Sequence, residues 1–213
     1  MPNNMTFLKA TECYNTFEQA VPAPYLRKVF ACENATKATV TVAACGFYEL
    51  YLDGVRYTKG HLAPYISNTD HYVYYDEYEI ELSAGEHAIG LHLGNGFQNN
   101  PGGYIWDFDK SPFRSAPMVA VSVCGGDGTV LCDSADGFKT APSPITADDY
   151  RFGEVYDARL EVPGWNTVGF DDSAWSATIP AETPRGECHI TDVDPIKTRC
   201  ELTAVSIKCG GIS

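Results

Sequence analysis

Residues 47–57 read FYELYLDGVRY, and this stretch indicates most clearly which kind of fold the chain adopts. Two runs, in which apolar and aromatic side chains alternate with others, flank the pair Asp53-Gly54. Period-two alternation is typical of a strand, and Asp-Gly favours a tight turn with positive φ. We therefore expect a hairpin in which Tyr48, Leu50 and Leu52 face one side of a sheet and the intervening residues face the other.

Similar short alternating runs occur outward from this hairpin along most of the chain. The clearest is Tyr72 to Leu82, YVYYDEYEIEL, and no run of more than about ten residues has convincing helical periodicity. Many short strands without intervening helices predict an all-β chain, an antiparallel β-sandwich of the jelly-roll kind. The strands are expected at 25–30, 38–44, 47–57 (the hairpin), 72–82, 87–94, 117–124, 129–132, 138–141 and 201–207.

The domain division follows from where turn-forming residues gather. Residues 1–24 are polar and end in Val-Pro-Ala-Pro, so they are expected to precede the fold, and 25–213 to form one β-sandwich domain. Within it, 142–195 is rich in proline and glycine. Three aromatic residues, Phe152, Trp165 and Trp175, are expected to pack that region back on the sandwich.

Composition excludes several classes of partner. The chain has 213 residues, 44% of them hydrophobic, with a net charge of −13 and a pI near 4.6. An acidic chain of this kind is not expected to bind nucleic acid or an anionic membrane surface, because both require clustered cations. No apolar run reaches the roughly 20 residues that span a bilayer, and no secretion signal is visible, so we expect a cytoplasmic protein or a fragment of a longer one.

The cysteines and histidines do not form a recognisable metal or redox motif. The eight cysteines include no pair at two-residue spacing, and the five histidines include no pair at helical ligand spacing. Without a secretion signal, we expect the thiols to be free rather than paired in disulfides.

The densest group of ligand-capable side chains lies in residues 91–112, LHLGNGFQNNPGGYIWDFDKSP, where a strand runs into a long loop. Amides both donate and accept hydrogen bonds, aromatic rings stack on sugars, and carboxylates bind hard cations, so the loop suits a sugar with or without calcium. The alternative is structural, with amides capping turns and an aromatic ring filling a gap. The candidate sugar contacts are Asn95, Asn99, Asn100, Tyr104 and Trp106, and the candidate calcium ligands are Asp70, Asn95 and Asp107, with Asn99 and Asn100 as further possibilities.

Three segments together resemble the N-terminal β-sandwich region of bacterial α-L-rhamnosidases of glycoside hydrolase family 78. They read GFYELYLDG (46–54), AGEHAIGLHLGNGF (84–97), and GEVYDAR followed by GWNTVGFDDSAW (153–175). The resemblance covers roughly 25–205 and implies a jelly roll of the galactose-binding type that precedes a catalytic (α/α)6 barrel. It also implies that related domains bind L-rhamnose with the help of calcium.

The resemblance places the catalytic carboxylates in that barrel, beyond these residues, so no catalytic residue is assigned and the chain alone is expected to be inactive. Three hypotheses remain open. The first is an accessory domain that binds a rhamnose-containing carbohydrate, and the second is a purely structural module that packs on the catalytic domain. The third is a self-sufficient enzyme that uses Glu154 and Asp157, although beside Arg159 these two carboxylates more often form a salt-bridged brace.

Overall fold

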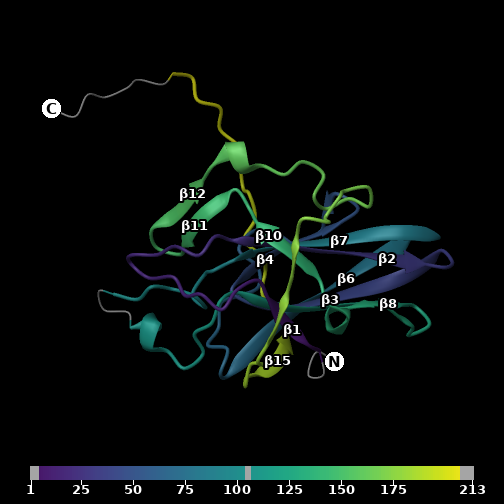
Figure 1. The fold of residues 1–213 in the computed structure, drawn as a ribbon, viewed down its shortest axis with the longest axis horizontal. Helices are drawn as coiled ribbons and strands as arrows, with labels where there is room; N and C mark the ends of the chain where they lie inside the picture. The colour runs from purple at the N-terminus through teal and green to yellow at the C-terminus, as the bar shows by residue number, and fades with distance from the viewer. Residues whose placement is uncertain (1–4, 104–106, 207–213) are drawn as a thin grey trace.

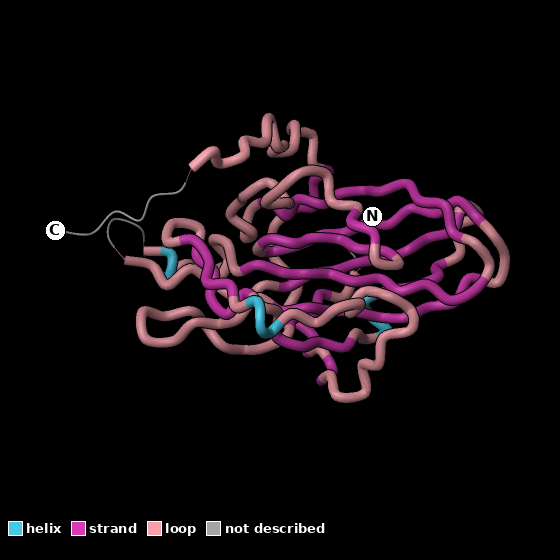
Figure 2. Tube along the Cα trace, turned by 90° about the horizontal axis from the view of Figure 1, so that it is seen from above, coloured by secondary structure: helices cyan, strands magenta, loops and turns pink. Residues whose placement is uncertain are grey.

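The strands pair into two sheets that face each other as a β-sandwich, with a small separate ribbon beside them (Figure 1). The computed structural model describes residues 5–103 and 107–206. Strands run along the long axis of the molecule (Figure 2). The all-β, sandwich prediction is confirmed, whereas the galactose-binding type stays a prediction.

The first sheet has seven strands. In spatial order they are β14 (Ile179–Ala181), β1 (Phe7–Lys9), β8 (Met118–Gly125), β3 (Thr36–Cys45), β6 (Tyr72–Leu82) and β15 (Glu187–Ile190), and β9 (Val130–Asp133) also pairs with β8. The central β3 is antiparallel to both β6 and β8. At one edge, β15 pairs in parallel with the first residues of β6.

The second sheet has six strands. Their order is β13 (Ser176–Ala177), β10 (Lys139–Pro142), β2 (Pro24–Cys32), β7 (Gly85–Gly94), β4 (Phe47–Leu52) and β5 (Val55–Arg56). The expected hairpin is present as β4 and β5, and its turn has positive φ at Asp53 (49°) and Gly54 (84°). Tyr48, Leu50 and Leu52 share the buried face, as predicted.

The hydrophobic core lies between the two sheets. The first sheet contributes β-branched residues such as Val40, Val121 and Ile80, and the second contributes Leu50 and Leu91. A smaller buried cluster that includes Phe7, Val73 and Met118 forms apart from this core. Strands that alternate between buried and exposed positions supply this arrangement directly, because successive side chains point to opposite faces.

A two-stranded ribbon, β11 (Ile145–Asp149) and β12 (Gly153–Tyr156), projects from the sandwich (Figure 1). Short 3₁₀ turns, η2 (Phe108–Lys110), η3 (Ser134–Asp136) and η4 (Ala158–Leu160), interrupt the loops. In the described residues no helix is long and apolar enough to cross a membrane.

Residues 162–175, which we call the strap, lie over the outer face of the six-stranded sheet. Trp165 stacks on Tyr25 of β2 with ring centroids 4.1 Å apart, and Trp175 lies 6.4 Å from the same ring. Gly90 of β7 leaves room for the indole, because a Cβ built there would lie 2.8 Å from Trp165 Cζ3. Arg27, which is 1% exposed, donates to the backbone carbonyls of Trp165 and Thr167 at 2.8 Å each.

Some details of the prediction differ from the structure. Residues 7–9, which were expected to precede the fold, form β1 and lie between β14 and β8 in the seven-stranded sheet. Phe152 is 61% exposed, so it is not a buried anchor. Residues 201–206, the described part of the expected last strand, form no strand, and Val205 is fully exposed. The last strand of the described chain is instead β15. It pairs with the edge of β6, and this pairing satisfies the backbone hydrogen-bonding groups of β15.

Candidate functional site

The three candidate amides at the end of β7 lie inside the protein. Asn95 and Asn99 are 0% exposed and Asn100 is 1% exposed. Asn95 donates through its side chain to Val21 O at 2.8 Å and to Asp148, and its backbone N–H donates to Asp148 Oδ2 at 2.6 Å. Asn95 Oδ1 in turn accepts from Asn99 Nδ2 at 2.8 Å.

The neighbouring amides tie the loop to two other segments. Asn99 Oδ1 accepts the backbone N–H of Asn15 at 3.0 Å, and Asn100 donates to Asp149 Oδ2 at 2.9 Å. Buried polar groups are stable only when they are hydrogen-bonded, and these are. The amides therefore brace the loop from within, and their contact with a sugar stays a prediction.

Asp148 lies at the centre of these hydrogen bonds, and the sequence analysis did not identify it. Burial raises the pKa of its carboxyl group above 3.8, although the hydrogen bonds from Asn95 act in the opposite direction. Asp148 is 53 residues from Asn95 along the chain, so no local pattern could pair them.

The two aromatic candidates, Tyr104 and Trp106, lie outside the described residues. They remain predictions.

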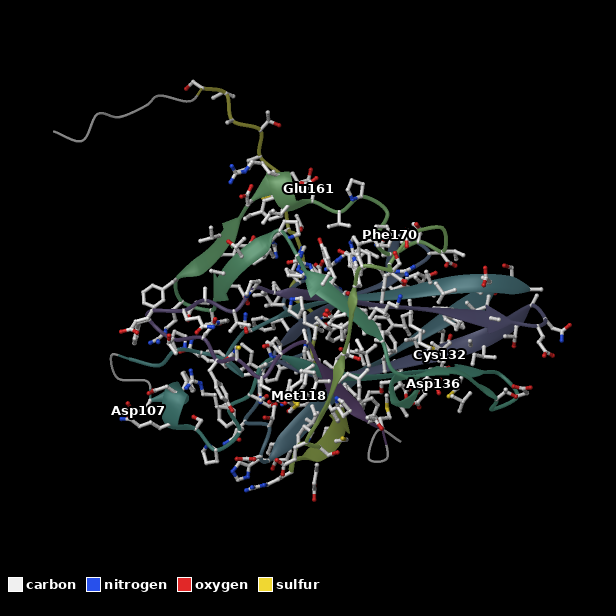
Figure 3. All side chains as sticks on the ribbon, in the orientation of Figure 1. Asp107, Met118, Cys132, Asp136, Glu161 and Phe170 are labelled. Carbon is white, nitrogen blue, oxygen red and sulfur yellow. The ribbon has the colours of Figure 1, made fainter. Side chains whose placement is uncertain are left out.

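The candidate calcium ligands make separate contacts. Asp107 pairs with Lys110 at 3.1 Å on the exposed η2 turn, at the periphery in Figure 3. Asp70 lies in the Asn68–Tyr72 turn, and Asn95 is committed to Asp148. Within 5–103 and 107–206, no group of three or more His, Cys, Asp or Glu side chains could hold a metal ion. A calcium-binding role for Asp70, Asn95 and Asp107 therefore stays a prediction.

Of the three brace candidates, two form an ion pair. Asp157 accepts from Arg159 Nε at 2.8 Å and from Arg159 Nη2 at 2.5 Å, and it also caps η4 through the Arg159 backbone N–H at 3.1 Å. These hydrogen bonds from Arg159 lower the pKa of Asp157 below 3.8. Glu154 lies apart from this pair, on the exposed strand β12.

A cleft of about 810 Å³ is lined by β4, β7, His61, Leu62 and the ribbon. It lies on the outer face of the six-stranded sheet, because Glu49 and His92 alternate with core residues along their strands. The cleft combines carboxylates with apolar surface. The carboxylates are Glu49, Asp148, Asp149 and Glu154, and the apolar side chains are Phe47, Leu62, Ile145 and Tyr150.

His92 sits in the floor of this cleft as a neutral base. Burial lowers its pKa from 6.5 to about 4, even though Glu49, its cross-strand partner, acts to raise it. Its Nε2 lies 3.0 Å from Ser143 Oγ, and its ring lies 4.7 Å from that of Tyr25. A hydroxyl can donate or accept, so a neutral imidazole satisfies this contact.

Tyr150 is the exposed aromatic group of the cleft, and sequence reasoning missed it. It is 47% exposed and packs on Phe97 and Phe47, with ring centroids 4.4 and 6.3 Å away. The signal that could have found it is its position in the ADDY stretch, at the tip of a ribbon whose residues were expected to be mostly loop with short extended pieces.

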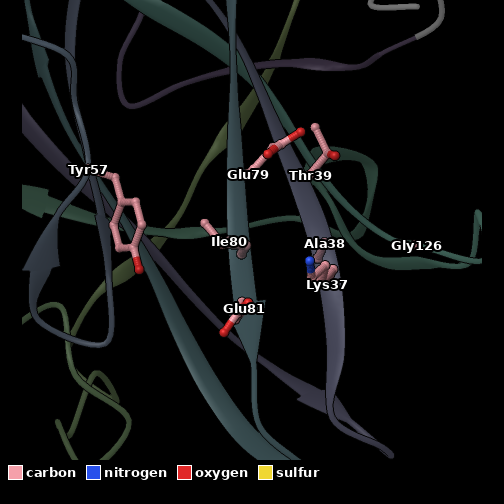
Figure 4. Close-up of a pocket in the computed structure, with 8 residues that line it drawn as sticks. All are labelled: Lys37, Ala38, Thr39, Tyr57, Glu79, Ile80, Glu81 and Gly126. Atoms are coloured by element: carbon pink, nitrogen blue, oxygen red, sulfur yellow. The ribbon is translucent and has the colours of Figure 1, made fainter.

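A second cleft, of about 560 Å³, lies beside β3 and β6 (Figure 4). Lys37 and Glu81 form one of its cross-strand pairs and Thr39 and Glu79 another, and Tyr57 reaches it from outside these strands. Its polar side chains are those of an ordinary solvated sheet face, so we take the first cleft as the candidate site.

The comparisons with known proteins agree with this fold. Residues 33–200 match the family model described as the α-L-rhamnosidase N-terminal domain. An α-L-rhamnosidase of Formosa agariphila is 32% identical over 166 residues, which are 72% of this chain and 17% of that protein. One from Streptomyces avermitilis is 31% identical over 178 residues, 81% of this chain and again 17% of the relative.

A solved structure supports the same assignment. The α-L-rhamnosidase from Dictyoglumus thermophilum superposes with a TM-score of 0.78 at 28% identity, over 92% of this chain and 23% of that chain. This chain thus spans only about 17% of the length of the curated relatives it matches. With the family model covering most of its residues, the chain belongs to the α-L-rhamnosidase N-terminal domain family.

Proposed function

We propose that this chain is a non-catalytic domain of a longer α-L-rhamnosidase, in which a separate catalytic domain hydrolyses terminal α-L-rhamnosides. The relatives that it matches are α-L-rhamnosidases of which it covers about a sixth. A module of that size in a larger enzyme needs no reaction of its own, and its partner is then the catalytic domain of the same polypeptide.

The proposal that the chain is non-catalytic rests on the hydrogen bonds and ion pairs that its candidate carboxylates already make. Hydrolysis of a glycoside needs an acid and a base on either side of the bond, with the acid protonated near neutral pH. In the cleft, Asp148 and Glu154 are cross-strand partners, but both oxygens of Asp148 accept hydrogen bonds from Asn95. Asp157 is bound by Arg159, which favours its ionised form.

Turnover of 4-nitrophenyl α-L-rhamnoside tests this proposal. We expect the purified chain to release no nitrophenol above the buffer rate. Release that disappears in both Glu154→Gln and Asp157→Asn would overturn it and support the self-sufficient enzyme. The Glu187→Gln variant, which alters an exposed carboxylate outside the cleft, is the matched control.

A second candidate function is binding of a rhamnose-containing carbohydrate in the cleft. The half-exposed ring of Tyr150 and the side chain of Leu62 offer apolar contacts that suit the methyl group of rhamnose, and the carboxylates accept from sugar hydroxyls. The volume of about 810 Å³ accommodates an oligosaccharide end. The alternative is a purely structural module, which the buried and fully bonded amides favour.

Titration calorimetry with L-rhamnose separates these alternatives. Heat that is lost in Tyr150→Ala and kept in Val130→Ala, an exposed control on β9, supports binding in the cleft. Heat lost in Trp106→Ala but not in Tyr150→Ala would move the site to the loop within residues 91–112. Repeating the titration with calcium and then a chelator tests the metal, and no heat at millimolar sugar would leave the structural module.

A further inference from the structure

The start of β7 contains a histidine whose two ring nitrogens both face hydrogen-bond acceptors. His87 Nδ1 lies 2.6 Å from Asp53 Oδ2, and His87 Nε2 lies 3.0 Å from the backbone oxygen of Ser83. The side chain of His87 is 7% exposed, so its ring is largely shielded from water, whereas the side chain of Asp53 is 39% exposed. An ionised carboxylate and a carbonyl oxygen can only accept.

A neutral imidazole carries one N–H and one lone pair. In either tautomer, one ring nitrogen would therefore direct its lone pair at an oxygen and leave a buried contact repulsive. Only the imidazolium donates at both positions. We propose that His87 is held as the imidazolium and acts as a pH-sensitive lock on the corner formed by Asp53, Ser83, His87 and Ala88, which we call the His87 corner.

The His87 corner joins turns that are distant in the sequence. Asp53 Oδ1 accepts the Ala88 N–H at 2.8 Å, and the Asp53 N–H donates to Ala88 O at 2.9 Å. The next residue, Gly54, donates its N–H to Asn166 O in the strap at 3.0 Å. Holding Asp53 in place therefore also holds the turn on which the strap rests.

The surroundings of His87 contain one negative charge, opposite in sign to that of the imidazolium. The β4–β5 turn presents Asp53, the β6–β7 turn presents the neutral Ser83 carbonyl, and β2 presents the Phe30 ring at 5.8 Å. In the part of the chain that the structure describes, Asp53 is the only charged group that acts on His87. Burial alone would lower the pKa of His87, but the bonds to Asp53 and Ser83 outweigh it, and the pKa is raised above 6.5.

The direction of the effect follows from this raised pKa. The folded protein holds the proton more tightly than the unfolded chain does, so the contribution to stability is complete below pH 6.5 and is lost as the pH rises through the folded-state pKa. Deprotonation should then loosen the corner and, through Gly54, the strap.

Nitrogen-15 NMR of the imidazole groups across a pH titration tests the protonation state. We expect His87 to show two protonated nitrogens at pH 6.5 and a midpoint above that value. In Asp53→Asn the midpoint should fall below 6.5, because burial remains while the carboxylate is gone. Asn-Gly keeps the preferred turn sequence, so this variant should still fold. Burial lowers the pKa of His92 to about 4, so His92 should stay neutral over this pH range.

Hydrogen exchange tests the lock itself. The protection factors of the Gly54 and Ala88 amides, corrected for intrinsic exchange, should fall as His87 deprotonates. They should show no such step in His87→Gln, whose side chain does not titrate. A neutral His87 at pH 6.5, or protection that is unchanged through its midpoint, would overturn the proposal. If Asp53→Asn fails to fold, the wild-type midpoint and the His87→Gln exchange still decide it.

Discussion

Replacing Arg27 with methionine should detach the strap from the six-stranded sheet. The guanidinium donates to Trp165 O and Thr167 O at 2.8 Å each, forms an ion pair with Asp172, and lies 5.4 Å from the ring centre of Phe170. Methionine keeps the apolar stem but removes all of these donors. Two strap carbonyls and one carboxylate then lose a partner that is 1% exposed.

The loss in the free energy of unfolding can be estimated from the contacts that Asp172 keeps in the variant. Removing one partner of a buried ion pair costs about 3–5 kcal/mol. Asp172 is 23% exposed and keeps Lys139 Nζ at 2.7 Å, so we expect the lower end, ~3 kcal/mol. At roughly 2–4 °C per kcal/mol for a chain of this size, Tm should fall by about 6–12 °C.

Urea unfolding gives the free energy, and the near-ultraviolet circular dichroism of the Tyr25–Trp165 stack reports the strap locally. The matched control is Lys139→Met, which removes a 44% exposed partner of the same carboxylate and should cost under about 1 kcal/mol. Equal losses in the two variants, or an unchanged aromatic signal in Arg27→Met, would refute the view that Arg27 fastens the strap.

Three further outcomes follow from the same structure. Because burial lowers the pKa of His92 to about 4, the folded chain binds this proton less tightly than the unfolded chain. The contribution of His92 to the free energy of unfolding, up to about 3 kcal/mol, should be complete above pH 6.5 and lost as the pH falls towards 4. Urea unfolding of wild type and His92→Phe above pH 6.5 and near pH 4 should show that the variant lacks this part of the pH dependence. Gly90→Ala should cost about 1–3 kcal/mol by thermal unfolding, since its Cβ would meet Trp165 at 2.8 Å, whereas Gly169→Ala, with no atom within 4 Å, should cost much less. Asn95→Ala should cost about 1–3 kcal/mol in urea because it leaves Val21 O and Asp148 short of donors, and a loss no larger than that of the exposed Val130→Ala control would contradict the bracing role.

Prediction from the sequence succeeded where a strand carries its own pattern. β6 has the bounds that alternation predicts, Tyr72 to Leu82, and the turn of the β4–β5 hairpin has the positive φ values that Asp-Gly favours. It failed at 201–206, the described part of the expected last strand, where apolar character was read as a strand although a strand also needs an edge to pair with. The edge of β6 is instead paired with β15, and this long-range parallel pairing is something that no local pattern reports.

In the candidate site, too, local features could be predicted from the sequence and long-range contacts could not. The sequence identified Asn95, Asn99 and Asn100 as a group, but left open whether they face a ligand or the protein. The answer depends on Asp148 and Asp149, some 50 residues away, which the fold brings against them. Asp157 and Arg159 form an ion pair because they are two residues apart, within reach on a single turn, whereas Glu154, the third residue of the expected brace, lies on β12.

By itself, therefore, the sequence determined the strand pattern, the tight hairpin turn and the kinship with rhamnosidase N-terminal domains, because alternation, turn chemistry and motif order are properties of neighbouring residues. Only the tertiary structure decided that the loop amides are interior braces, that Arg27 fastens a strap, and that a cleft opens beneath the ribbon. Each of these depends on which distant groups share a buried environment, where a hydrogen bond or charge has no water to replace its partner.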